Sequence, residues 1–159
     1  MCRDCDHPAD RVEEHLATLR RCIDARGWAV QVLERDRAHP PWAYTVGLTL
    51  LGLPELVLTG LPVLQGARLL DTTADHLTRT CLPSPGKRFT PPGGPLLEVV
   101  GVARPWAHLL VAARLFGEGI AALQLVHADA AGRWPWDSEY SGLPGGQPVL
   151  GIRARPPDG

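Results

Sequence analysis

The sequence has no excess of either charge, because 16 basic residues are balanced by 17 acidic ones and the net charge is −1. Proteins that bind nucleic acid or anionic membranes through electrostatics carry a clustered excess of lysine and arginine. Long hydrophobic runs are also absent. The longest lies around residues 109–113 and is interrupted by Arg114, far short of the roughly 20 residues that cross a bilayer. We therefore expect neither a nucleic-acid partner nor a membrane partner.

A secretory signal is also missing. The chain begins MCRDCDHP, which is acidic and carries cysteines where a signal peptide would be basic and then apolar. We therefore expect a cytoplasmic protein. In that compartment its four cysteines should be reduced, metal-bound or buried and should not form structural disulfides.

The sequence does have the length and apolar content of one globular domain, with 159 residues of which 45% are hydrophobic. Apolar residues at helical spacing predict helices over about 11–26, 63–79 and 104–119. Asp10 should cap the first helix and Gly27 should end it. In the third helix, Trp106, Leu109, Leu110, Ala113 and Phe116 should point inward. Alternating apolar residues predict strands over 28–35 and 42–49. Short apolar stretches predict strands over 55–59, 96–103 and 120–128, and a further edge strand at 148–153.

The order of these elements predicts an α+β fold, in which a mainly antiparallel β-sheet carries about three α-helices packed on one face. We expect a cysteine-containing N-terminal segment at 1–10, a single domain at 11–153 and a tail at 154–159. Within the domain, the stretch 82–95 holds five prolines and three glycines. That composition predicts a long exposed loop without a regular element.

The stretch HPPWAYTVGLT (39–49) predicts a strand with one large and one small face. The large face holds Trp42, Tyr44, Val46 and Leu48, and the small face holds Ala43, Thr45, Gly47 and Thr49. The small face, above all Gly47, would let a helix lie closely over the sheet. The aromatic face either fills the core or lines a pocket, into which Tyr44 would direct its hydroxyl.

Three motifs occur in order along the chain: HPPWAYTVGLT, LPELVLTGLP and ALQLVHADAAGRWPWD. In this combination the chain resembles the DUF4262 family over roughly residues 1–153. The opening Cys-x-x-Cys-Asp resembles the actinobacterial branch of that family. One departure is that His127-Ala128-Asp129 stands where many relatives carry Trp-Pro-Asp. The resemblance implies family membership and carries no activity with it.

The pattern C-x-x-C-x-H, formed by Cys2, Cys5 and His7, is typical of a zinc site. Two thiolates and an imidazole can bind one zinc ion, but a closed tetrahedral site needs a fourth ligand. The candidates for that ligand are Cys22, Cys81 and His15. The alternative is a reduced N-terminus that holds no metal.

The stretch HADAAGRWPWD (127–137) combines two tryptophans with charged residues, as the walls of small-molecule pockets do. We expect a small ligand to bind between this stretch and the WAYTVGL strand. The expected lining residues are Tyr44, Glu55, Gln124, Asp129, Trp136 and Asp137. Each also has a structural alternative: a core tyrosine, a solvated carboxylate at a strand end, or a rigid turn that Asp129 caps and Gly132 permits.

No catalytic signature is present in the sequence, so no catalytic residue is assigned. His108 lies among apolar neighbours and is interpreted as a core residue. The rival function is a non-enzymatic protein-interaction or regulatory module, such as an immunity-type partner, that uses the loop 82–95. A deep pocket would favour the ligand-binding hypothesis, and a solid tryptophan cluster would favour the interaction module.

Overall fold

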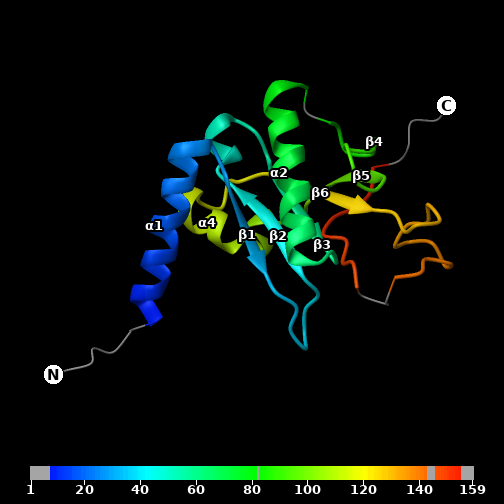
Figure 1. Ribbon diagram of the computed structural model, residues 1–159, viewed down its shortest axis with the longest axis horizontal. Coiled ribbons are helices and arrows are strands. Elements are labelled where there is room, and N and C mark those ends of the chain that lie inside the picture. Colours follow the sequence, from blue (N-terminus) through cyan, green and yellow to red (C-terminus); the bar gives the residue numbers. More distant parts are fainter. Residues whose placement is uncertain (1–7, 82, 143–145, 155–159) are drawn as a thin grey trace.

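The computed structural model describes residues 8–81, 83–142 and 146–154. Its centre is a six-stranded sheet in the order β1-β2-β3-β6-β5-β4 (Figure 1). The strands are β1 (Ala29–Leu33), β2 (Trp42–Val46), β3 (Glu55–Thr59), β4 (Arg88–Phe89), β5 (Leu97–Gly101) and β6 (Ala122–His127). Neighbouring strands are antiparallel except β3 and β6, which are parallel. The predicted α+β class with a mainly antiparallel sheet is confirmed.

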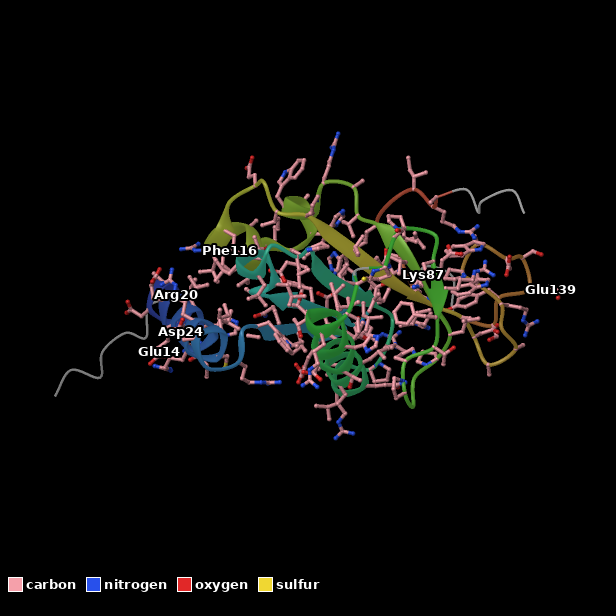
Figure 2. All side chains as sticks on the ribbon, turned by 90° about the horizontal axis from the view of Figure 1, so that it is seen from above. Glu14, Arg20, Asp24, Lys87, Phe116 and Glu139 are labelled. Carbon is pink, nitrogen blue, oxygen red and sulfur yellow. The ribbon has the colours of Figure 1, made fainter. Side chains whose placement is uncertain are left out.

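Helices cover both faces of the sheet, and the expectation of one covered face is wrong. The helices are α1 (Pro8–Arg26), α2 (Val63–Arg79), α3 (Pro105–His108) and α4 (Leu110–Phe116). Figure 2 shows α2 on one side of the sheet and the end of α4, marked by Phe116, on the other. The reason is visible in β3, where all five residues are buried. A strand buried on both sides needs a covering layer on each.

The small face of β2 does carry a helix. Gly66 of α2 comes so close that a Cβ built on it would lie 3.7 Å from the Cβ of Ala43. Around this contact lies the first core, which includes Leu56, Leu58, Leu70, Ala74, Leu97 and Leu125. The opposite face buries Tyr44 and Val46 against α1 and α4, in a second core with Leu16, Leu19, Ile23, Leu109 and Ala112.

β2 ends earlier than predicted, at Val46, because Gly47 adopts a φ of 127°. The chain then turns into a short 3-10 helix at Leu48–Leu51. Leu48 therefore joins the core beneath α2 and does not share the face of Tyr44, as the alternation predicted. Gly47 makes room for the junction of α1 and β1: a Cβ there would lie 2.7 Å from the carbonyl oxygen of Gly27.

The predicted third helix is two short helices. Leu109 has φ −102° and ψ 67°, which interrupts the helical path between α3 and α4. The interruption changes the direction in which the side chains on either side of it point. As a result, Trp106 is 40% exposed and Leu110 is 66% exposed. The expectation that these two side chains point inward is wrong, whereas Leu109 is fully buried as expected.

The first helix begins at Pro8, two residues before the predicted cap, and ends at the predicted Gly27, whose N–H bonds the carbonyl of Ile23 at 2.7 Å. The second helix and the strand 55–59 have the predicted bounds. Among the described residues, no helix is both long and apolar enough to cross a membrane.

Two segments near the sheet edge differ from the sequence predictions. Part of the loop 82–95 pairs with β5 as the edge strand β4, and Pro83 and Pro91 are buried. Residues 148–153, predicted as an edge strand, form no strand in the structure. They belong to an irregular segment, residues 146–154, which we call the C-terminal strap.

Candidate functional site

Glu55 is fully buried at the start of β3, and its carboxylate is surrounded by donors from one turn. It accepts bonds from the backbone N–H groups of Gly47, Leu48 and Thr49 at 2.8, 3.2 and 3.1 Å. The hydroxyls of Thr45 and Thr49 add bonds of 2.7 and 2.9 Å. A carboxylate with five donors holds the turn after β2, and that is the role its contacts indicate.

Tyr44 is 1% exposed and lies in the core between the sheet and α4. Its hydroxyl accepts a bond of 3.1 Å from the backbone N–H of Val111. Burial raises the pKa of this phenol, with the charge of Glu55 adding to the rise and the bond from Val111 opposing it. The tyrosine is therefore neutral across the ordinary pH range and anchors the first turn of α4.

Gln124, fully buried on β6, binds the C-terminal strap. Its amide nitrogen donates to the carbonyl of Pro148 at 2.7 Å, and its amide oxygen accepts from the N–H of Leu150 at 2.7 Å. The hydroxyl of Thr59 also donates to Pro148, at 2.9 Å. The side chain of Gln124 thus binds the backbone groups of the strap that a neighbouring strand would otherwise bind. The strap is therefore held in place without forming a strand.

A second glutamine makes the complementary contact from the strap itself. The side chain of Gln147 accepts from the N–H of His127 at 2.8 Å and donates to its carbonyl at 2.9 Å. It also donates to the hydroxyl of Tyr140 at 2.9 Å. Burial lowers the pKa of His127, against bonds to the backbone of Thr59 and Ala128 that raise it. This neutral imidazole lies 3.2 Å from the carbonyl of Thr59.

Asp129 organises the loop after β6, as the turn alternative expected. Its carboxylate accepts from the backbone N–H of Ala131 and Arg133 at 2.9 Å each, and from the N–H and hydroxyl of Ser141 at 3.0 Å each. The bond from Arg133 is the largest of the effects that hold the pKa of this carboxyl well below its usual range, although burial opposes it. Gly132 has a φ of 78° and bonds back to Asp129, so the predicted turn is confirmed.

The two tryptophans of this loop are stacked, with ring centroids 5.4 Å apart and planes 7° from parallel. Arg88 lies over the Trp134 ring at 4.6 Å, and Arg153 lies over the Trp136 ring at 3.6 Å. Both guanidinium groups bind Glu98, at 2.9 Å and 2.8 Å. This set is a solid cluster that joins the loop, β4, β5 and the strap. Asp137 is exposed beside it, and its carboxylate accepts from the N–H of Trp134 at 2.9 Å.

The six residues expected to line one pocket occupy separate places. Glu55 pairs with Ala122 at the start of β3 and β6, whereas Asp129 follows the far end of β6. Seven residues of extended chain separate Ala122 from Asp129, roughly 20 Å. Tyr44 and Gln124 point to the same face, but each is in register with Val57, so β3 lies between them. Asp129, Trp136 and Asp137 do share one loop.

An open hollow lies at the end of the sheet where β1 turns into β2. We call it the turn hollow, and its volume is about 570 Å³. It is lined by Leu33, Glu34, Asp36, His39, Pro40, Trp42, Ala107, His108 and Leu150. Trp42 and His108 are stacked with ring centroids 5.9 Å apart and form its aromatic wall. The strap contributes Leu150 to the lining. The side chain of Gln124 holds Leu150 in place by accepting a bond from its backbone N–H.

The polar groups of the turn hollow come mostly from one Asx turn. The Oδ1 atom of Asp36 accepts from the N–H of Ala38 and of His39 at 2.7 Å each, and lies 3.3 Å from the ring of His39. The bonds from Ala38 and then His39 lower the pKa of this carboxyl, so it stays ionised at neutral pH. The indole N–H of Trp42 is buried and has no acceptor among the described residues.

A second hollow, of about 580 Å³, lies on the other side of the same turn. It shares Asp36, His39 and Pro40 with the turn hollow, and it is also lined by Gly60, Pro62 and Tyr140. Tyr140 lies three residues after Asp137, the end of the GRWPWD stretch. The two hollows therefore flank the turn between β1 and β2, and the segment after GRWPWD contributes to the second one.

Sequence reasoning missed Asp36, His39 and Trp42 as site residues, and it interpreted His108 as a core residue. One signal was available: Asp36 and His39 stand three residues apart before two prolines, a spacing typical of an Asx turn. The stack of Trp42 on His108 could not be found in this way, because it joins β2 to a helix 66 residues later.

The zinc ligands proposed from the sequence, Cys2, Cys5 and His7, lie outside the described residues. Of the candidate fourth ligands, Cys22 and Cys81 are exposed, and the ring of His15 lies 2.6 Å from the side-chain oxygen of Gln31. In the part of the chain that the structure describes, no three histidine, cysteine or acidic side chains form a group that could hold a metal ion.

The model of the family described as "Domain of unknown function (DUF4262)" matches residues 22–141. The chain belongs to the DUF4262 family. The matched range begins within α1 and includes the sheet, the Asp129 loop and the lining of the turn hollow except Leu150, so the family resemblance inferred from three motifs is confirmed. Comparisons with curated proteins and with solved structures gave no match.

Proposed function

We propose that this DUF4262 domain binds a small organic cation with a planar apolar body in the turn hollow. The body packs against the Trp42–His108 wall, and the positive group faces the carboxylates of Glu34 and Asp36. The observation that carries the proposal is the lining of the hollow, where the stacked rings of Trp42 and His108 lie beside the carboxylates of Glu34 and Asp36.

The size and composition of the hollow support a small molecule. Its volume of about 570 Å³ falls within the range of roughly 300–1,000 Å³ typical of ligand pockets. Leu33, Pro40, Ala107 and Leu150 supply apolar surface around the aromatic pair. Such a lining, with a few convergent polar groups at one side, is what fixes a ligand of one orientation.

The charge of the hollow supports a cation. Glu34 and Asp36 are the carboxylates of the lining, and no lysine or arginine belongs to it. All three of the contacts made by Asp36 use Oδ1, so its Oδ2 faces outward without a partner among the described residues. An aromatic face beside these carboxylates attracts a cation through the ring quadrupole as well.

Five of the six residues chosen from the sequence enter this proposal in another role. Gln124 holds the strap that carries Leu150 into the hollow. Tyr44 fixes the start of α4 close to His108. Asp129, Trp136 and Asp137 shape the loop whose end carries Tyr140. These residues support the walls of the turn hollow, and Trp42, Asp36 and His108 make the proposed contacts with the ligand.

The test uses three planar probes of nearly equal shape: benzamidine, benzamide and benzoate. Binding is followed by NMR through the indole N–H signal of Trp42, assigned with Trp42→Phe. We expect benzamidine to shift this signal and to bind at least about tenfold more tightly than benzoate. Asp36→Asn should remove that preference, and Asp75→Asn, an exposed carboxylate on α2, should leave it unchanged. Equal binding of the three probes, or no shift with any of them, would overturn the proposal.

The rival interaction module also has support from one observation. Trp134 is only 4% exposed and is covered by Arg88, so the tryptophans form a solid cluster and not a pocket wall. The loop 82–95, which this rival would use, carries the edge strand β4 within it.

A further inference from the structure

An apolar hollow of the surface lies at the opposite end of the molecule from the Asp129 loop. Figure 1 shows α1 at one end and the loop after β6 at the other, and Figure 2 labels Glu14 of α1 and Glu139 of that loop at these two ends. The hollow lies between α1 and the α3–α4 segment, and its volume is about 690 Å³. We call it the helix groove. Its lining is Arg11, Val12, His15, Leu16, Trp106, Leu110, Val111, Ala113, Arg114 and Glu118.

From this groove we propose that the protein binds an amphipathic helix of a partner protein, with acidic residues beside its apolar face. The apolar part of the argument rests on three large side chains from three helices. Val12 of α1 is 42% exposed, Trp106 of α3 is 40% exposed and Leu110 of α4 is 66% exposed. Single exposed apolar residues are ordinary, but three around one hollow are typical of a binding surface.

The interruption at Leu109 produces this surface. In one continuous helix, the apolar spacing of this segment would bury Trp106 and Leu110 together with Leu109. The non-helical conformation of Leu109 leaves Leu109 in the core and turns the other two outward. The groove is then bordered by exposed apolar side chains of α1 on one side and of α3 and α4 on the other, and helix-in-groove complexes bury the apolar face of a helix in such a groove.

The charge of the rim selects the partner. The two arginines Arg11 and Arg114 line the groove, against one carboxylate, Glu118. Arg114 also lies 3.7 Å from Glu13, but both side chains are more than 60% exposed. An exposed pair at this distance contributes little, so Arg114 can turn to a partner carboxylate at small cost. A partner helix with aspartate or glutamate along its flanks complements this rim.

The experiment is a selection from a displayed library of helical peptides about 15 residues long, long enough for a stable helix. The library is selected on the full chain and counter-selected on Leu110→Glu. We expect apolar residues at positions i, i+3 or i+4, and i+7, flanked by acidic residues. The best peptide should lose at least about tenfold in affinity for Leu110→Glu. Leu64→Glu on α2, where Leu64 is 73% exposed, is the matched control and should bind normally.

A charge-reversal variant and two further assays decide the remaining outcomes. Arg114→Glu should weaken the selected peptide and improve a version with its acidic residues changed to lysine. Absence of enrichment over Leu110→Glu, or enrichment without acidic residues, would overturn the proposal. It would also fail if Leu110→Glu converts a dimer to a monomer, because a second copy then covers the groove. Binding to phosphatidylglycerol vesicles that Leu110→Glu abolishes would replace the helix by a membrane surface.

Discussion

Glu55 and Glu98 are both buried carboxylates on strands of the same sheet, but they are held by different kinds of donor. Glu55 has no cation among its bonded partners, and backbone N–H groups and threonine hydroxyls surround it. Glu98 binds Arg88 and Arg153, whose side chains are 48% and 34% exposed. The difference lies in what each donor can do when the carboxylate is lost. An exposed guanidinium turns to water, whereas a buried backbone N–H cannot.

The two carboxylates also organise regions with different roles. Glu55 fixes the turn after β2, a local junction of the fold, while Glu98 links β4 and the strap to the tryptophan cluster through charged side chains. A neutral donor shell is insensitive to salt and rigid. A charged shell whose arginines reach solvent is weaker and is screened by salt.

The largest effect is expected for Glu55→Gln. The substitution places an amide NH₂ among the N–H groups of Gly47 and Thr49, so donors meet donors in a buried site. We expect a loss of roughly 3–5 kcal/mol in the free energy of unfolding, measured by urea denaturation at neutral pH. A loss below about 1 kcal/mol would mean that the turn does not depend on the carboxylate.

The next effect concerns the backbone of the same turn. Gly47→Ala introduces a Cβ 2.7 Å from the carbonyl of Gly27 at a φ of 127°, and we expect a loss of roughly 2–4 kcal/mol. Gly52→Ala is the matched control, because Gly52 also has a positive φ but a Cβ there meets no atom within 4 Å. It should cost roughly 1 kcal/mol. Equal losses would show that backbone conformation alone, and not the close approach, requires glycine at position 47.

The smallest effect is expected for Glu98→Gln, at about 1–2 kcal/mol, because both arginines can be solvated in the variant. Burial raises the pKa of Glu98, but the bonds from Arg153 and Arg88 outweigh it and leave the pKa below its ordinary value. A lowered folded-state pKa contributes stability that is complete above the unfolded-state pKa and is lost as the pH falls through the folded-state value. The difference between wild type and variant should therefore shrink in urea titrations from about pH 7 to about pH 3. A difference that grows in acid would contradict the assignment of the arginines as the stabilising partners.

Local signals predicted most of the regular elements. The turn residues on either side of ELVLT and the apolar spacing of 63–79 located β3 and α2 with their observed bounds. Gly27 ended α1 as predicted, since a helix terminus depends on the few residues around it. The Asp129–Gly132 turn was recognisable for the same reason.

The predictions that failed depended on contacts distant in the sequence. The periodicity of 104–119 has no feature that reveals the break at Leu109, which accompanies burial of that residue in the core with α1. The strap contains a short apolar stretch that suggested a strand, but the side chain of Gln124 takes the bonds that a strand neighbour would make. A residue pattern shows which side chains are apolar, but it does not show which other part of the molecule packs against them.

The sequence by itself determined the family, the α+β class and the rigid turn at Asp129, because motif spacing, periodicity and turn chemistry are local properties of the chain. Only the tertiary structure decided where six candidate residues would lie and that Glu55 would meet the turn at Gly47. It also decided that Trp42 would stack on His108 beside Asp36. Those positions follow from the order of strands in the sheet and from helices on both of its faces. Such an arrangement is selected by the burial of apolar surface across the whole domain, which no short stretch of sequence encodes.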